Sequence, residues 1–355
     1  MNAIGGKMKK KITFMLALAM LTMSACSAQG TAGTQTQEPV LSADPVQTEE
    51  ASKPEQSTEL QTIVVDHAFG TTEIPAEPER IVSVYLEDML LALEVPLKLA
   101  VTIGEDNYLS ETMSQRGIAT AAAGENVNFE LIAEQDPDLI ITMDVITPEV
   151  YESLSKIAPT IAFSRRAWHE SIISLGEALG RKDQAMKVIS DYDAHVAEAK
   201  TKLADVLAEE PTAAAIRFTA KTMRLYFPNV KAAETRQGYV TSLYEDLGFG
   251  LEDYINELWS EADPARENTQ ISMEILPELQ SDYIFMIVGS AGNLTDAQKQ
   301  DLADFDEMQN SDVWKGLQAV QSGRVYNLES RFWISDGPLA DTMKIDQVVE
   351  LLLNE

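Results

Sequence analysis

Cysteine and histidine are scarce in this sequence of 355 residues, and basic residues are few relative to acidic ones. A single cysteine excludes an intramolecular disulfide framework. Only 27 lysines and arginines stand against 57 aspartates and glutamates, which gives a formal net charge of −30. Such an acidic surface repels nucleic acid, so we expect no nucleic-acid partner. Against this background, any local cluster of arginines becomes informative.

The sequence also lacks the local patterns of common catalytic sites. It has neither a Gly-x-Ser-x-Gly elbow nor a glycine-rich loop that could cradle phosphates. Carboxylate pairs occur throughout the chain, so none of them stands out as catalytic. The three histidines, His67, His169 and His195, are scattered, which argues against a zinc or manganese site. We therefore expect neither an enzyme nor a resident cofactor.

The N-terminus carries the parts of a targeting signal. Four lysines precede an apolar run at 12–22, which is too short to span a bilayer but suits the core of a signal peptide. Small residues then lead to Cys26, the only cysteine. We predict that residues 1–25 are a lipoprotein signal peptide, starting at Met1 or Met8. Cys26 would then be the lipidated first residue of the mature protein.

The segment after this cysteine is polar and contains no aromatic residue between positions 27 and 59. It cannot bury enough apolar surface to offset the entropy of ordering. We predict a disordered tether at 26–59, between the lipid anchor and a folded body. The protein would therefore be extracytoplasmic and anchored to the cell membrane, on a Gram-positive surface in preference to a periplasm.

Beyond the tether, short apolar strands alternate with helical segments. An opening hairpin is predicted at 62–74. Strands are predicted at 80–84, 97–102, 138–142, 160–163, 212–219, 223–227, 282–288 and 324–328, and helices at 87–93, from 147 onward, at 239–247 and at 339–353. This alternation indicates βαβ units and mainly parallel sheets.

A stretch of different period separates the two α/β halves. From Lys182 to Glu209 apolar residues recur at spacings of three and four, with no glycine or proline before Pro211. This pattern predicts one long amphipathic helix. We therefore predict an α/β fold of two Rossmann-like lobes, at 60–181 and 211–355, joined by one long rigid helix at 182–210.

Five segments, at 81–93, 128–141, 175–180, 323–326 and 332–340, carry recognisable patterns such as Pro137-Asp138-Leu139-Ile140 and Gly337-Pro338-Leu339-Ala340. In this order they resemble the siderophore and cobalamin class of periplasmic binding proteins. The resemblance covers residues 61–355. It implies a shallow ligand cleft between two lobes, little hinge motion, and delivery of a bound solute to an ABC permease with its ATPase. We expect a monomer.

The ligand that this resemblance implies is a ferric siderophore, whose oxygens already hold the iron. The protein then needs no direct metal ligand; it needs arginine forks for the oxygens and aromatic rings for flat apolar walls. At least one of Arg165 and Arg166 is expected in the site, and Arg166 is assigned to it. The expected ligand-binding residues are Tyr85, Arg166, Arg217, Arg224, Tyr226, Arg236, Arg331 and Trp333. A hydroxamate or citrate-type chelate is favoured, and haem or cobalamin stays open as the alternative.

Two glutamates stand in matching contexts in the two halves of the chain. Glu130 lies in the segment 128–141, and Glu274 lies in a similar segment just before the strand at 282–288. The resemblance implies that one surface glutamate per lobe pairs with arginines of the permease. We expect Glu130 and Glu274 to serve this docking, which would affect orientation and on-rate more than affinity.

Overall fold

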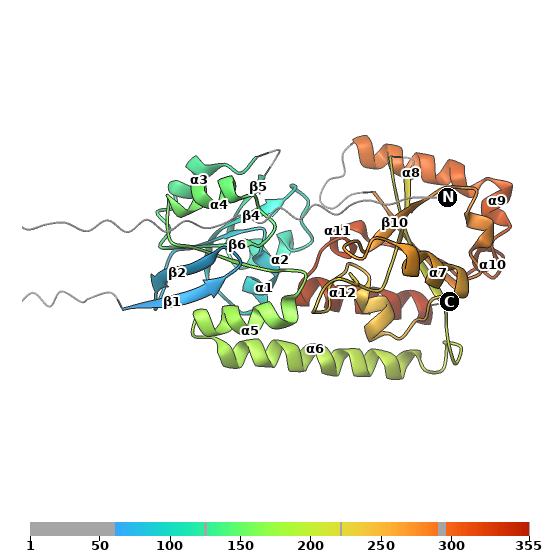
Figure 1. The fold of residues 1–355 in the computed structure, drawn as a ribbon, viewed down its shortest axis with the longest axis horizontal. Coiled ribbons are helices and arrows are strands. Elements are labelled where there is room, and N and C mark those ends of the chain that lie inside the picture. Colours follow the sequence, from blue (N-terminus) through green and yellow to red (C-terminus); the bar gives the residue numbers. More distant parts are fainter. Residues whose placement is uncertain (1–60, 124–125, 221, 290–295, 355) are drawn as a thin grey trace, which may run out of the picture. The chain divides into compact units, whose positions relative to one another are not determined.

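The computed structural model describes residues 61–123, 126–220, 222–289 and 296–354. The expected signal peptide at 1–25, Cys26 and the tether at 26–59 lie outside the described residues. All described residues belong to one unit by their contacts, and Figure 1 shows its fold. Within these residues no helix is both long enough and apolar enough to cross a membrane.

The described chain begins with the hairpin that the sequence predicts. β1 (Thr62–His67) pairs antiparallel with β2 (Gly70–Pro75) along its whole length. Gly70 has a φ of 115°, a conformation that residues with a side chain rarely adopt. The Ala68 N–H donates to the Ala162 carbonyl, which ties the hairpin to the neighbouring sheet.

The first lobe is built on a parallel sheet in the order β5-β4-β3-β6-β7. Its strands are β3 (Ile81–Val84), β4 (Leu97–Ile103), β5 (Ala119–Ala123), β6 (Leu139–Met143) and β7 (Thr160–Phe163), and its helices are α1 (Glu87–Ala92), α2 (Ser110–Gln115), α3 (Phe129–Ala133), α4 (Pro148–Ser155) and α5 (Trp168–Ala178). β3 and β7 are buried along their whole length, as expected for strands covered on both faces.

The second lobe is built on a mixed sheet in the order β10-β9-β8-β11-β12. Parallel pairing joins β8 (Ala213–Thr219), β11 (Tyr283–Val288) and β12 (Val325–Leu328), whereas β9 (Thr222–Tyr226) and β10 (Asn268–Ile271) add antiparallel pairs. The helical elements are η1 (Ser242–Asp246), α7 (Asp253–Glu261), η2 (Leu276–Glu278), α8 (Asp296–Gln309), α9 (Asp312–Lys315), α10 (Gln318–Gln321), α11 (Ser330–Trp333) and α12 (Pro338–Leu353). The predicted α/β class with mainly parallel sheets is confirmed.

One long helix, α6 (Lys182–Leu203), connects the two lobes (Figure 1). Its 22 residues span about 33 Å at 1.5 Å per residue. Ala185 and Tyr192 pack into the hydrophobic core of the first lobe, and Ala199 and Leu203 pack into that of the second. The prediction of a helix that joins two lobes is therefore confirmed.

The structure corrects three details of the predicted elements. α6 ends at Leu203 instead of continuing to 209, and the chain turns there on its way to Pro211, which cannot continue a helix. The helix predicted at 239–247 is only the short π-helix η1, and the Tyr239 N–H before it donates to the Glu267 side chain. The strands β5 and β10 were not predicted, because alanine and polar residues give weak strand signals.

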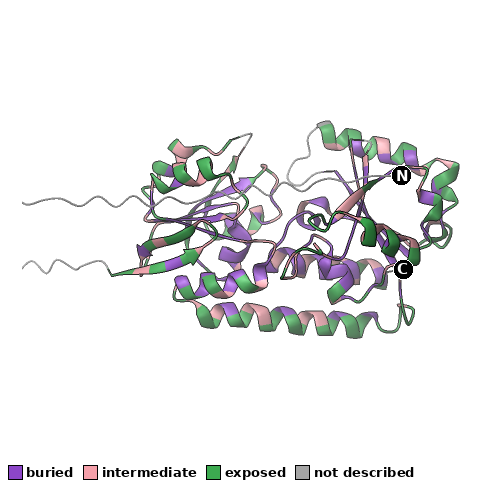
Figure 2. Ribbon diagram, viewed as in Figure 1, coloured by how far each residue is buried: buried purple, intermediate pink, exposed green. Residues whose placement is uncertain are grey.

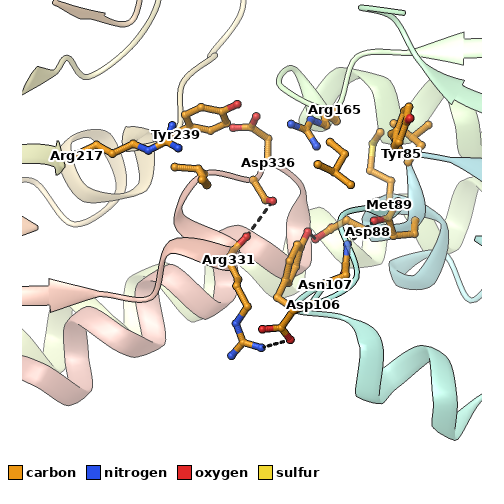
Figure 3. Close-up of a pocket in the computed structure, with 16 residues that line it drawn as sticks. Tyr85, Asp88, Met89, Asp106, Asn107, Arg165, Arg217, Tyr239, Arg331 and Asp336 are labelled. Atoms are coloured by element: carbon orange, nitrogen blue, oxygen red, sulfur yellow. Dashed lines mark hydrogen bonds and ion pairs between the residues drawn. The ribbon is translucent and has the colours of Figure 1, made fainter. Parts of the chain in front are cut away.

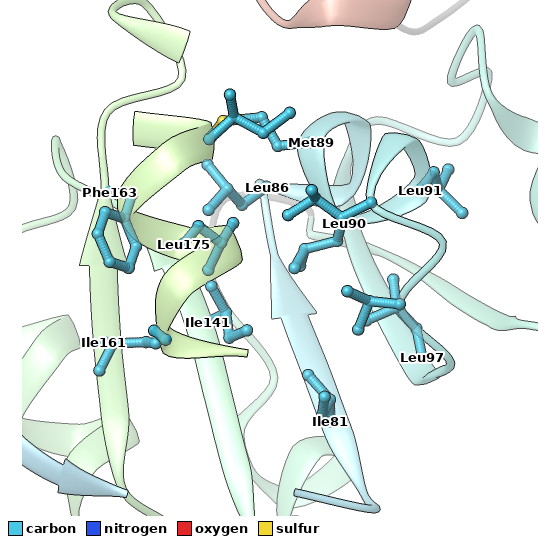
Figure 4. Close-up of a cluster of buried hydrophobic side chains, with 14 of the residues drawn as sticks. Ile81, Leu86, Met89, Leu90, Leu91, Leu97, Ile141, Ile161, Phe163 and Leu175 are labelled. Carbon is cyan, nitrogen blue, oxygen red and sulfur yellow. The ribbon is translucent and has the colours of Figure 1, made fainter. Parts of the chain in front are cut away.

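The buried residues follow the strands and the inner faces of the helices (Figure 2). In the first lobe, Leu90 and Leu91 of α1 belong to the same cluster as Ile81, Ile141 and Leu175 (Figure 4). Each such side chain contributes about 1.5–3 kcal/mol relative to exposure. The core therefore gives firm support to the strand ends, from which the cavity described below is built.

Candidate functional site

A cavity of about 280 Å³ is lined by residues of both lobes (Figure 3). Most of the lining segments follow the carboxyl ends of parallel strands, the place where open α/β sheets bind ligands. The lining consists of Tyr85, Leu86, Glu87, Asp88, Met89, Ile103, Asp106, Asn107, Tyr108 and Arg165 from the first lobe, and of Arg217, Tyr239, Arg331, Ile334, Ser335 and Asp336 from the second.

Tyr85 occupies the sharp junction between β3 and α1. Its φ of 63° lies in the left-handed region, which costs an L-residue other than glycine about 1–2 kcal/mol. Its N–H donates to the Val101 carbonyl at 2.9 Å, so the conformation is held by the sheet. Burial, together with the charge of Glu87, raises the pKa of the Tyr85 phenol, which therefore stays neutral. Strained backbone of this kind is typical of functional sites.

Arg165 follows β7 and brings a guanidinium to the first-lobe wall of the cavity. Within the described residues it makes no hydrogen bond or ion pair. Burial alone would lower the pKa of Arg165, but Asp336, Tyr239, Tyr108 and Glu87 outweigh burial and raise it. Arg165 is therefore a permanent cation whose donors are available to a ligand.

The two other arginines of the cavity come from the second lobe and are partly committed. Arg331 donates to Asp106 of the first lobe and to Glu329, both at 3.0 Å. Arg217 donates through Nε to the Gly289 carbonyl at 3.0 Å. Each guanidinium has five N–H donors, so both can still offer hydrogen bonds to a ligand.

Asp88 lies on the cavity wall and also connects the lobes. Its carboxylate accepts the N–H groups of Leu339 and Ala340 at the start of α12 and the Tyr108 hydroxyl at 2.7 Å. Burial raises the pKa of Asp88 to about 7, against the opposing effect of these donors. A Cβ at Gly337 would lie 2.3 Å from the Asp88 carboxylate, so this close approach requires glycine. All the polar atoms of Asp88 are therefore engaged.

Two further carboxyl groups of the cavity are incompletely paired. Glu87 accepts from the Asn107 amide at 2.8 Å through one oxygen, and its other oxygen is buried without a hydrogen-bond partner. Asp336 is 4% exposed, and its Oδ2 also lacks a hydrogen bond. Burial raises the pKa of Glu87, and it raises that of Asp336 to about 6, although Lys344, Arg165 and Arg166 oppose the latter shift.

The structure places three of the eight expected ligand residues on the cavity wall, namely Tyr85, Arg217 and Arg331. Arg166 lies beside them, paired with Glu267 at 3.0 Å and stacked over the Tyr239 ring at 5.0 Å. Its neighbour Arg165 reaches the cavity instead.

The remaining four expected residues do not line the cavity. Arg224 stands opposite Arg217 in the β8–β9 register, and Tyr226 is 2% exposed. Arg236 pairs with Asp246 and, at 3.7 Å, with Glu245. Trp333 is fully buried, and its indole N–H donates to Gln347 at 2.7 Å. A ligand contact by any of these four stays a prediction.

The acids and the Asp106–Tyr108 loop are the part of the cavity that the sequence did not indicate. Glu87 and Asp88 belong to a chain rich in carboxylates, so composition could not single them out. Their position directly after the first buried strand was the available signal. In the described ranges, no group of three or more His, Cys, Asp or Glu residues is arranged to hold a metal ion.

Comparison with known proteins decides the family. A family model described as periplasmic binding protein matches residues 82–332. The chain belongs to the periplasmic binding protein family. Members are non-enzymatic, solute-binding components, so the expectation that the protein is not an enzyme is confirmed.

Individual relatives agree with this assignment. The chain is 28% identical over 341 residues to "Probable siderophore-binding lipoprotein YfiY" of Bacillus subtilis, covering 93% of this chain and 94% of that protein. It is 26% identical over 352 residues to "Iron(3+)-hydroxamate-binding protein YxeB" of the same organism, covering 98% of each. The solved structure of Staphylococcus aureus SirA complexed with staphyloferrin B superposes with a TM-score of 0.67 at 26% identity, covering 82% of this chain and 99% of SirA.

Proposed function

We propose that this periplasmic binding protein is the substrate-binding lipoprotein of an ABC importer and that it captures a ferric siderophore in the cavity. The observation that carries the proposal is that three arginines, Arg165, Arg217 and Arg331, line one cavity from both lobes. Relatives named for binding siderophores and iron(3+)-hydroxamate, and a similar structure that holds staphyloferrin B, support it. A hydroxamate or citrate-type chelate is favoured.

The proposed mechanism is capture without chemistry. A ferric chelate arrives with its iron already coordinated, so the arginines bind the ligand's oxygens and the metal keeps its own shell. Charge-assisted hydrogen bonds from arginine suit such oxygens because they are short and directional. Tyr85, Tyr239, Met89 and Ile334 supply apolar surface to the same cavity. We expect dissociation constants between micromolar and nanomolar, about −8 to −12 kcal/mol.

Tryptophan fluorescence tests this ligand class directly. Trp168 and Trp333 lie three residues after Arg165 and two after Arg331, on the segments that deliver these arginines to the cavity. Ferric hydroxamate and ferric citrate-type chelates should quench the emission saturably, whereas haem and cobalamin should not. A panel in which no ferric chelate quenches would contradict the proposal. Saturable quenching by haem or cobalamin alone would replace it with the alternative ligand.

Glu130 and Glu274 are the proposed contacts with the permease. Glu130 is exposed on α3, and Glu274 is exposed just before η2, so each lobe presents one of them. Neither carboxylate makes an ion pair among the described residues. Replacing both with glutamine should lower siderophore uptake by cells and leave fluorescence titrations unchanged. The exposed Glu152 and Glu257 provide a matched control pair, and equal uptake by both double variants would exclude the docking role.

Lipid attachment at Cys26 and an extracytoplasmic location complete the proposal. The lysine-rich start, the short apolar run and the cysteine support it, as do relatives whose names include lipoprotein. A Cys26→Ala variant should move from the membrane fraction to the soluble extracytoplasmic fraction. Retention of this variant on the membrane would show that another segment anchors the protein.

A further inference from the structure

The polar groups of the cavity fall into two sets. The first set already has protein partners: Asp88 accepts three hydrogen bonds, and Asp106 pairs with Arg331. Asn107 is also engaged, because its amide donates to Glu87 and its oxygen accepts the Leu109 N–H at 2.8 Å. These residues shape the wall and have little left to offer a ligand.

The second set consists of groups with open hydrogen-bonding positions: the Arg165 guanidinium and one carboxylate oxygen each of Glu87 and Asp336. Both acids are more than nine-tenths buried, at 7% and 4% exposure. The Nε of Arg166 is 3.9 Å from the open Asp336 oxygen, too far for a hydrogen bond. A buried carboxylate oxygen without a donor is costly. A ligand that matches this wall therefore carries hydrogen-bond donors as well as hydrogen-bond acceptors.

The charge of the wall disfavours a ligand that is anionic on every side. Four carboxyl groups, those of Glu87, Asp88, Asp106 and Asp336, line the cavity beside three arginines. A polyanion could pair with the arginines only by placing its other oxygens against these acids. Like charges brought together without water reject a ligand, and rejection of this kind creates specificity.

We propose that the end of the chelate that enters the cavity is amphoteric: an anionic oxygen pairs with Arg165, and a protonated amine donates to Glu87 and Asp336. This inference rests on the proposed function and names its ligand class. All three residues line the same cavity, and Figure 3 shows Arg165 and Asp336 on its wall. An amine beside a carboxylate or hydroxamate presents both signs to that cavity.

Two matched pairs of chelates test the inference on the whole mature protein. One pair is a linear ferric trihydroxamate with a terminal primary amine and the same chelate with this amine acetylated. The other is a ferric α-hydroxycarboxylate chelate with an amino-acid end and its analogue without the amine. We compare the two forms by fluorescence titration near pH 7.5. In the class of chelate that binds, the amine form should bind at least tenfold more tightly than the amine-free form. Equal or tighter binding of the amine-free form would overturn the inference and leave the proposed function intact. If neither class bound, the proposed function itself would fail, and the inference with it.

Single substitutions then identify which residues recognise the amine. Glu87→Gln and Asp336→Asn should each reduce the preference for the amine form to less than about threefold. The exposed Glu257→Gln should keep the full preference. If both cavity variants retain that preference, the amine does not contact these acids and the assignment is wrong. The two variants are independent, so failure of one to fold leaves the other decisive.

Discussion

The cavity and a buried contact between the lobes, called the joint below, are both formed by residues of the two lobes. Polar groups of the joint are paired within the protein, whereas some polar groups of the cavity are not. The joint is the buried contact of α1 and α5 with α12, formed by Asp88, Trp168, Asp341 and Lys344. Asp341 accepts from the Trp168 indole at 2.9 Å and from the Lys344 ammonium at 2.8 Å. Lys344 is fully buried and also donates to the Ser335 carbonyl at 2.7 Å.

Every charged group of the joint thus has partners within the protein, whereas the cavity keeps Arg165, Glu87 and Asp336 incompletely paired. The difference separates two roles. Asp88 and Asp341 hold the lobes in one arrangement, because Asp88 accepts from Leu339 and Ala340 across the joint and Asp341 accepts from Trp168. Charges left open gain their partners only when a ligand arrives. We therefore expect little hinge motion at the joint. We expect a bound ligand to affect mainly the incompletely paired groups of the cavity.

Removing one charge from the joint should have the largest effect on stability. Asp341→Asn leaves the Lys344 ammonium buried without its counter-ion, which costs about 3–5 kcal/mol for pairs of this kind. Urea unfolding followed by circular dichroism measures the loss. Asp191→Asn is the matched control, because Asp191 pairs with Lys187 on the exposed face of α6 and should cost less than about 1 kcal/mol. Similar losses in both variants would remove the distinction between the joint and an ordinary surface pair.

The open acids of the cavity should make stability depend on pH. Asp336 has a pKa of about 6 in the folded protein, against an ordinary value of 3.8. Between these values the folded state binds more protons than the unfolded state, so stability falls as pH rises from about 4 to 6 and then levels off. A shift of about two units corresponds to about 2–3 kcal/mol.

The variant Asp336→Asn isolates this contribution. The unfolding free energy of the wild type minus that of the variant should fall between pH 4 and 6 and stay flat from pH 7 to 8. Subtraction removes the contributions of Asp88, whose raised pKa acts in the same direction, and of the acidic surface. A difference that is flat throughout, or that rises with pH, would mean that Asp336 is ionised more readily in the folded protein than its burial implies.

The sequence indicated the architecture because its signals are repeated along the chain. Apolar periodicity located α6, and alternation of strands and helices established the class. Elements with weak or local signals were missed, as β5 and β10 show. The last residues of α6 were misjudged because the apolar spacing continues past Leu203, where the chain already turns.

The site was predicted less completely because it depends on side-chain direction. Arg165 and Arg166 are adjacent and chemically identical, yet one reaches the cavity and the other pairs with Glu267. Trp333 stands in a recognisable motif next to Arg331, but it packs in the core. The composition gave no signal for Glu87 and Asp336, since acids are abundant throughout the chain. Which of these side chains enters the cavity depends on the tertiary packing around each strand end.

The smallest expected effect distinguishes the cavity that the structure shows from the wider site that the sequence suggested. Arg165→Gln removes an uncommitted cation from the wall and should weaken binding of the ferric chelate about tenfold, or about 1.4 kcal/mol. Arg224→Gln alters a neighbouring strand residue that does not line the cavity, so its effect should stay below twofold. Fluorescence titration of both variants with one chelate measures the difference. If Arg224→Gln weakened binding as much as Arg165→Gln, the bound chelate would have to extend beyond the cavity onto β9, and the half-buried face of that strand that carries Arg224 would belong to the site.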